Sequence, residues 1–176
     1  NIGKSLAKFV EKGKLTQDAA DAALARLRPA SLGDAKNADL VVEAIIEDSK
    51  IKRDLFTQLN QIVAGDVIFA SNTSSISINE LAAGSGRPAS FIGMHFFNPV
   101  PLMALVEVVV AMSTAEPVVT AITDLSRQLG KTPLRVKDWP GFVSNRVLMP
   151  LINEAIAAHS DGIADAETID KIMQLG

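Results

Sequence analysis

The chain has 176 residues, and its hydrophobic content of 48% is enough to build the core of a domain of ordinary size. The formal net charge is −3 with acids and bases interspersed, so neither a basic stripe for nucleic acid nor an acidic tail is present. The absence of cysteine excludes a disulfide framework and a cysteine-ligated metal. No apolar run approaches the ~18 residues of a membrane span, and no signal peptide is recognisable. We therefore expect a cytoplasmic protein without nucleic-acid or membrane partners.

Both ends of the sequence read as cuts in a longer protein. Asn1 stands in what reads as mid-helix, without an initiator methionine, and Gly176 directly follows a helical pattern. We expect the chain to be a piece of a larger protein.

The first 38 residues read as two helices followed by a loop. Four apolar residues at helical spacing predict a helix over residues 2–12, which Gly13 ends. Thr16 can cap a second helix that runs to about residue 27. Residues 31–38 then read as a loop.

Five short apolar runs, rich in β-branched residues, predict buried strands. They cover residues 40–46, 66–70, 91–94, 105–110 and 134–136. Alternation of such strands with helical segments predicts an α/β fold with a largely parallel sheet.

Helical patterns separate these strands. An amphipathic helix is predicted over residues 48–62, and a capping box at Ser77 starts a short helix through about residue 83. Thr114 can cap a further helix through residue 129, which Gly130 closes.

The pattern changes after residue 138, and no further strand is predicted. Residues 142–159 read as a long helix kinked at Pro150, and Asp165 can cap another helix through residue 175. We therefore place a domain boundary near Trp139, with domains over residues 1–138 and 139–176, the second being the start of an all-helical domain.

Polar residues follow the first three strands at the point where each strand ends. In an open parallel sheet, ligands bind beyond the carboxyl ends of the strands. We therefore expect one crevice to be lined by Glu47, Asn72, Ser74, His95 and Asn98.

A histidine in such a crevice can act as a general base, because imidazole takes or gives a proton near neutral pH. Glu107 lies in the next, Val-rich strand, where a buried carboxylate needs a partner, and His95 is the histidine within reach. We expect these two side chains to pair, with Ser74 beside them and Asn145 entering from the following helix. Taken singly, each residue also has an ordinary structural role, such as a turn or a solvated edge; together they favour a site.

Five blocks of the sequence resemble the 3-hydroxyacyl-CoA dehydrogenase family, in order and over nearly the whole chain. They are Asp39–Glu47, Ala70–Ser75, Gly93–Pro101, Leu105–Val108 and Lys137–Arg146. The resemblance implies a Rossmann-type NAD-binding domain followed by a helical domain that commonly dimerises. It also implies oxidation of L-3-hydroxyacyl-CoA to 3-ketoacyl-CoA with NAD, a step of fatty-acid β-oxidation.

The resemblance also implies roles for the crevice residues. His95 is similar to the family's catalytic base and Glu107 to its partner, while Ser74 and Asn145 are similar to the groups that bind the reacting oxygen. No metal is implied.

Further positions of this sequence match residues that contact the cofactor and the substrate. Those expected to contact NAD are Glu47, Lys52, Asn72, Ser74 and Asn98. Ser5 and Lys12, two helical turns apart, are similar to the family's coenzyme A contacts. The partners implied are an acyl-CoA substrate and a second copy of the chain, bound through the helical domain.

The sequence departs from the family pattern at both ends and at one loop. It lacks the glycine fingerprint of dinucleotide binding and most of the helical domain, so we expect this piece alone to be inactive. The stretch from Gly84 to Ala89 fits the fingerprint spacing but follows a helix and contains Pro88, so we discard it. Trp139 stands where the family pattern predicts a small polar residue.

Three alternatives stay open beside a stand-alone dehydrogenase. The chain could belong to the dehydrogenase part of a multifunctional β-oxidation protein. It could be a hydrolase with Ser74, His95 and Glu107 as a triad, although Ser74 lies in no G-x-S-x-G elbow. It could also be a non-catalytic member on the same fold.

Overall fold

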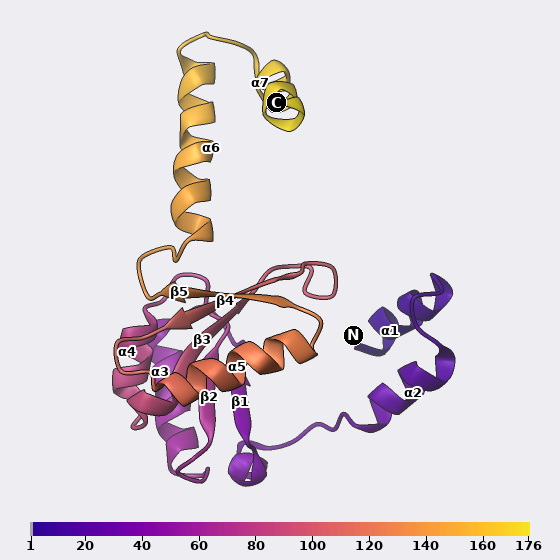
Figure 1. Ribbon diagram of the computed structural model, residues 1–176, viewed down its shortest axis with the longest axis vertical. Helices are drawn as coiled ribbons and strands as arrows, with labels where there is room; N and C mark the ends of the chain where they lie inside the picture. Colours follow the sequence, from indigo (N-terminus) through magenta and orange to yellow (C-terminus); the bar gives the residue numbers. More distant parts are fainter. Residues whose placement is uncertain (1) are drawn as a thin grey trace. The chain divides into compact units, whose positions relative to one another are not determined.

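A computed structural model describes residues 2–176, which divide into an N-terminal unit ending at Asp34 and a larger unit from Ala35 to Gly176 (Figure 1). The N-terminal unit contains helices α1 (Ile2–Glu11) and α2 (Gln17–Ala25). The hydroxyl of Thr16 accepts a hydrogen bond from the Ala19 N–H at 3.2 Å, which confirms it as the cap of α2.

Within the described residues, the larger unit is built on one five-stranded sheet with its strands in sequence order. The strands are β1 (Leu40–Glu43), β2 (Ile68–Ser71), β3 (Phe91–Phe96), β4 (Leu105–Val110) and β5 (Thr132–Lys137). Neighbouring strands run parallel except β3 and β4, which pair antiparallel. The predicted α/β fold with a largely parallel sheet is confirmed.

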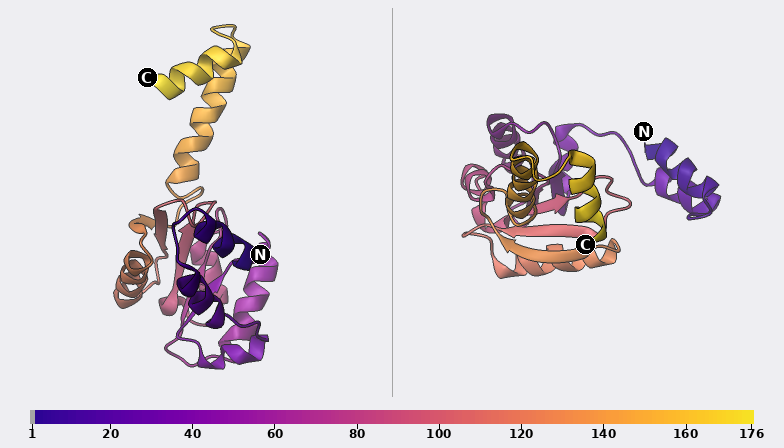
Figure 2. Two further views of the ribbon diagram at one scale, coloured as in Figure 1. Left: turned by 90° about the vertical axis from the view of Figure 1, so that its right-hand side faces the viewer. Right: turned by 90° about the horizontal axis from the view of Figure 1, so that it is seen from above.

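Helices cover both faces of this sheet, giving three layers (Figure 2). One face is covered by α3 (Ser49–Asn60) and α4 (Ile78–Gly84), and the other by α5 (Glu116–Gln128). Short 3-10 helices, η1 (Leu32–Asn37) and η2 (Pro88–Ser90), lie in the connections. Because side chains alternate along a strand, β2, β3 and β4 each send buried residues to both cores.

The two cores are separate sets of buried apolar side chains. Beneath α3 and α4 lie Phe56, Leu59, Phe69, Ile78, Leu81, Phe91 and Val109. Beneath α5 lie Ala70, Ile92, Met94, Val106, Val108, Val119 and Ile122.

Two helices follow the sheet, α6 (Ser144–Ser160) and α7 (Ala166–Leu175). Asp165 caps α7, as predicted, by accepting from the Thr168 N–H at 2.8 Å. Pro150 lies inside α6. Between residues 2 and 176, no helix is both long and apolar enough to cross a membrane.

Some predicted bounds were wrong for local reasons. β1 ends at Glu43 rather than at residue 46, because the Glu43 carboxylate turns the chain by accepting the Ile45 N–H at 2.6 Å. β3 extends past residue 94 to Phe96, because β4 pairs with it in an antiparallel register.

Thr114 does not cap α5, contrary to the prediction. The cap position belongs to Ala115, and the Thr114 hydroxyl donates to the Phe91 carbonyl at 2.7 Å and accepts from the Ala111 N–H. Thr114 therefore fastens the end of β4 to β3.

Gly93 allows α4 to approach β3 closely, two residues before His95. A Cβ at Gly93 would lie 2.7 Å from the Cβ of Val109 and 3.0 Å from Cδ1 of Ile78. Such overpacking forces the backbone or neighbouring side chains to move.

We predict that Gly93→Ala lowers the free energy of unfolding by about 1–3 kcal/mol, because the Val109 Cβ is fixed to its strand. Urea denaturation of the intact protein measures this. Gly65→Ala is the matched control, since a Cβ there meets no atom within 4 Å, and its effect should stay within about 0.5 kcal/mol. Equal stability of both variants with the parent would contradict the close packing.

Candidate active site

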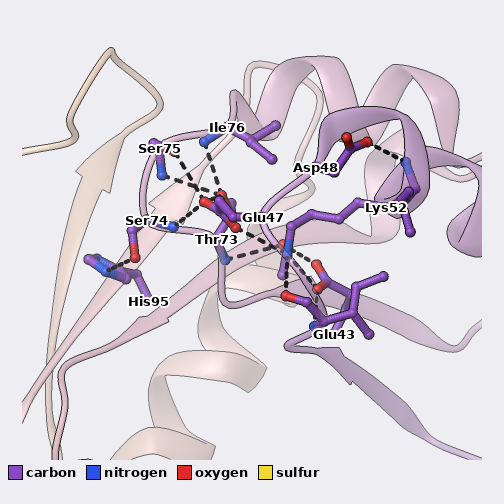
Figure 3. Close-up of polar contacts among 12 residues, drawn as sticks. Glu43, Glu47, Asp48, Lys52, Thr73, Ser74, Ser75, Ile76 and His95 are labelled. Carbon is purple, nitrogen blue, oxygen red and sulfur yellow. Dashed lines mark hydrogen bonds and ion pairs between the residues drawn. The ribbon is translucent and has the colours of Figure 1, made fainter.

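The carboxyl ends of β1, β2 and β3 lie at the same edge of the sheet, because these three strands are parallel. The polar residues predicted at this edge are found there or in the loops that follow. Figure 3 shows how several of them, including Glu47, Ser74 and His95, contact one another.

His95 is held between two partners. The antiparallel register of β3 and β4 puts Glu107 directly opposite His95, and Nδ1 of the imidazole lies 2.8 Å from Oε2 of Glu107. On the other side of the ring, Nε2 lies 3.0 Å from the Ser74 hydroxyl. Since a carboxylate only accepts hydrogen bonds, Nδ1 is the donor of this pair. In a neutral imidazole Nε2 then keeps its lone pair, and it faces the Ser74 hydroxyl.

Glu107 is 2% exposed, and both oxygens of its carboxylate accept hydrogen bonds. Oε2 accepts from His95 and from the Ser144 hydroxyl at 3.0 Å, while Oε1 accepts from the N–H groups of Ser144 at 3.0 Å and Val143 at 3.2 Å. Hydrogen bonds of this kind offset the cost of burying a charged carboxylate.

The same contacts satisfy the start of α6. The first N–H groups of a helix have no partner within it, and the cap residue Val143 offers no side-chain acceptor. Glu107 supplies that acceptor from β4, and a negative charge is favourable at this end of a helix. Glu107 therefore attaches α6 to the sheet and also orients the His95 ring.

The turn before α6 is shaped by two residues with positive φ. Gly141 has φ 79°, and a Cβ there would meet the Arg146 nitrogen at 3.0 Å. Phe142 has φ 50°, a backbone conformation that residues other than glycine rarely adopt. Its ring is buried, and the ring centroid lies 5.6 Å from that of the His95 imidazole. The Phe97 ring packs against His95 as well, at 4.6 Å.

Asp138 fastens the same linker at its beginning. Its carboxylate accepts from the Ser77 hydroxyl and the Asn79 N–H, both at 2.7 Å, which ties the end of β5 to the start of α4. The neighbouring Trp139 is 61% exposed.

The loop that carries Ser74 is organised by Glu47. Its Oε1 accepts from the Ser74 N–H at 3.0 Å, from the Ser75 hydroxyl at 3.1 Å and from the Thr73 hydroxyl (Figure 3). Burial alone would raise the pKa of Glu47, but hydrogen bonds from Thr73, Ser74 and Lys52 outweigh it and hold the pKa below its ordinary value of 4.5.

Lys52 is enclosed rather than free. Its ammonium group lies 2.6 Å from Glu43 and 3.2 Å from Glu47, and the side chain is 1% exposed. Glu43 also accepts from the Ser71 hydroxyl at 2.6 Å. This network joins the ends of β1 and β2 to α3.

The amides predicted at the site differ in their positions. Asn72 is engaged within the fold, because its Oδ1 accepts the Phe96 N–H at 2.8 Å. Asn145 donates to the Ser74 carbonyl at 3.1 Å and so lies beside the Ser74–His95 contact. Asn98 is exposed in the loop after β3.

The structure thus brings together His95, Glu107, Ser74 and Asn145 at one place, with Glu47 holding the loop beside them. Ser5 on α1 and Lys12 just after it lie in the N-terminal unit, which is described by itself. Their assignment to coenzyme A stays a prediction.

The sequence analysis did not predict a role in the site for Ser144, Phe142 or Glu43. Glu43 could have been predicted, since a carboxylate inside an apolar strand needs a partner. Ser144 and Phe142 could not, because their contacts depend on the turn before α6.

In the part of the chain that the structure describes, no three His, Asp or Glu side chains gather as a metal set. A mostly parallel sheet covered by helices on both faces defines a Rossmann-type α/β protein, and the His95–Glu107 contact lies at the carboxyl edge of this sheet.

Comparison with known proteins specifies the family. Residues 1–139 match the family model "3-hydroxyacyl-CoA dehydrogenase, NAD binding domain", and residues 141–176 match "3-hydroxyacyl-CoA dehydrogenase, C-terminal domain". The chain belongs to the 3-hydroxyacyl-CoA dehydrogenase family.

Relatives and a solved structure agree with this assignment. A probable 3-hydroxybutyryl-CoA dehydrogenase of Deinococcus radiodurans is 56% identical over 176 residues, 99% of this chain and 63% of that protein. One of Bacillus subtilis is 46% identical, over 99% of this chain and 61% of that protein. The crystal structure of (S)-3-hydroxybutyryl-CoA dehydrogenase from Ralstonia eutropha superposes with a TM-score of 0.95 at 48% identity, covering 98% of this chain and 62% of that one. The chain therefore spans 61–63% of the length of these relatives.

We predict that Glu47 makes the stability of the protein depend on pH in acid. Because its folded pKa lies below its ordinary value of 4.5, its contribution is present above that value and is lost as pH falls through the folded pKa. Thermal unfolding as a function of pH measures this, and Glu47→Gln should flatten the acid slope. Glu154→Gln, an exposed carboxylate on α6, is the control. An unchanged slope in Glu47→Gln would contradict the role given to these hydrogen bonds.

Proposed function

We propose that the intact protein, of which this chain spans part, is an NAD-dependent dehydrogenase that oxidises L-3-hydroxyacyl-CoA to 3-ketoacyl-CoA. The observation that carries the proposal is the orientation of His95, with Nδ1 facing Glu107 at 2.8 Å and Nε2 directed to the Ser74 side. The relatives named as 3-hydroxybutyryl-CoA dehydrogenases support the same reaction.

In this proposal His95 removes the proton of the 3-hydroxyl group through Nε2. Bound NAD supplies the acceptor for the hydride that leaves C3. Glu107 stabilises the imidazolium that forms and keeps the ring oriented. In the reverse direction the imidazolium returns the proton to the forming alkoxide.

Ser74 and Asn145 are proposed to donate hydrogen bonds to the reacting oxygen. Donors placed where negative charge develops stabilise a transition state more than a ground state. The short contacts from Ser74 to His95 and from Asn145 to the Ser74 carbonyl support this pairing.

The residues at the sheet edge fit a dinucleotide in two ways. Glu47, Ser74 and Asn98 are exposed there and offer acceptors and donors for direct contact. Lys52 and Asn72 are engaged inside the protein, so we propose that they hold the contacting groups in place.

The partners remain proposals of the same kind. Ser5 and Lys12 are proposed to bind coenzyme A, with the Lys12 ammonium as a point charge for a phosphate. A homodimer through the helical domain is supported by exposed apolar residues on α6 and α7, including Val147, Ile156 and Ile172. A cytoplasmic location is proposed with them.

One observation favours a second candidate, a Ser-His-Glu hydrolase. Ser74, His95 and Glu107 contact one another in the order of a catalytic triad. A serine-reactive probe that labels Ser74 and abolishes an esterase activity would support this alternative, and NADH formation without labelling would exclude it.

The direct experiment is to express the full-length protein and follow NADH formation with L-3-hydroxyacyl-CoAs of several chain lengths. We predict that His95→Gln lowers kcat by about 10²–10⁴-fold, because the reaction loses its general base. His159→Gln, at the exposed second histidine on α6, should leave kcat unchanged. An unaltered kcat in His95→Gln would remove His95 from the mechanism.

Glu107→Gln should also slow turnover and move the acid limb of the pH–rate profile to lower pH. The imidazolium loses its anionic partner, so it gives up its proton at a lower pH. Glu116→Gln, which breaks an exposed ion pair with Arg135, is the matched control. A profile that stays in place in Glu107→Gln would contradict the proposed pairing.

A further inference from the structure

Ser144, the first residue of α6, touches the carboxylate that orients His95. Its hydroxyl donates to Oε2 of Glu107 at 3.0 Å, and the same oxygen lies 2.8 Å from Nδ1 of His95. The Ser144 N–H holds the other oxygen, Oε1, at 3.0 Å. Ser144 thus donates a hydrogen bond to each oxygen of Glu107, one from its backbone N–H and one from its hydroxyl.

The Ser144 hydroxyl and the His95 imidazole both donate hydrogen bonds to Oε2 of Glu107. A hydrogen bond donated to a carboxylate stabilises its charged form, so that the oxygen attracts other protons less strongly. Because Glu107 is buried, the charge on Oε2 depends on the two protein groups that donate to it, His95 and the Ser144 hydroxyl.

Within residues 2–176, no other charged side chain forms a hydrogen bond or an ion pair with His95 or Glu107. On β5, the residue opposite Glu107 is Leu134. Next to His95 pack the rings of Phe97 and Phe142. The charged pair Glu47 and Lys52 engages the Ser74 loop through the Ser74 N–H and not through His95 or Glu107.

We infer that Ser144 is a positioning residue for the proposed reaction. Its hydroxyl holds the Glu107 carboxylate beside His95 and lowers the pH above which His95 can act as a base. This inference rests on the proposed dehydrogenase function. A residue of α6 would then help to set the pH at which His95, on β3, can act as a base.

The test is Ser144→Ala in the full-length protein. The acid limb of the profile of kcat/KM against pH should move to higher pH by roughly 0.3–1 unit, because Glu107 then holds the imidazolium more tightly. Well above that limb, KM for the acyl-CoA substrate should stay within about twofold, since Ser144 acts through Glu107.

Two variants separate this effect from a structural one. Ser144→Thr keeps the hydroxyl and should restore the parental profile. Ser126→Ala deletes a buried hydroxyl far from the site in the sequence, one that donates to the Ile122 carbonyl on α5 at 2.8 Å, and should leave the profile unchanged. Ser144→Gly is a second hydroxyl-free variant should the alanine variant fold poorly.

Titration of the His95 ring by NMR gives a readout that needs no turnover, with the signal assigned by its loss in His95→Gln. If the intact protein shows no dehydrogenase activity but the His95 titration moves to higher pH in Ser144→Ala, the proposed function fails and the Ser144 contact stands. A titration and profile that stay in place, or move to lower pH, in a folded Ser144→Ala protein would overturn the inference.

Discussion

The buried carboxylate of Glu107 is the interaction on which the rest of the site depends. It sits in the middle of β4, where a charge is costly unless its oxygens are occupied. Its partners come from two directions: the imidazole of His95 on β3, and the hydroxyl and N–H groups at the start of α6. Satisfying this one group therefore orients the candidate base and attaches α6 to the sheet.

A second network of charged and polar groups supports the other side of the imidazole. Lys52 bridges Glu43 and Glu47, and Glu47 collects three donors from the loop that carries Ser74. The two carboxylates stabilise the charge of the buried ammonium, and the hydrogen bonds to Glu47 hold the loop in place. The position of the Ser74 hydroxyl thus follows from contacts made at the ends of β1 and β2.

Much of this arrangement could be predicted from local patterns. Short β-branched runs gave the strands within a few residues, and caps at Thr16, Ser77 and Asp165 gave the starts of helices. The His95–Glu107 contact was expected because a carboxylate in a Val-rich strand needs a partner. Thr114 was predicted wrongly, because its hydroxyl finds a carbonyl on β3 that no local pattern reveals.

By itself, the sequence determined the α/β class, the family and the residues at the ends of the strands, because hydrophobic periodicity and short motifs are properties of neighbouring residues. Only the tertiary structure decided the antiparallel register that sets His95 opposite Glu107, the enclosure of Lys52 and the reach of Ser144 to a carboxylate 37 residues away. Those contacts join segments distant in the chain, and their geometry exists only after the sheet and helices have packed together.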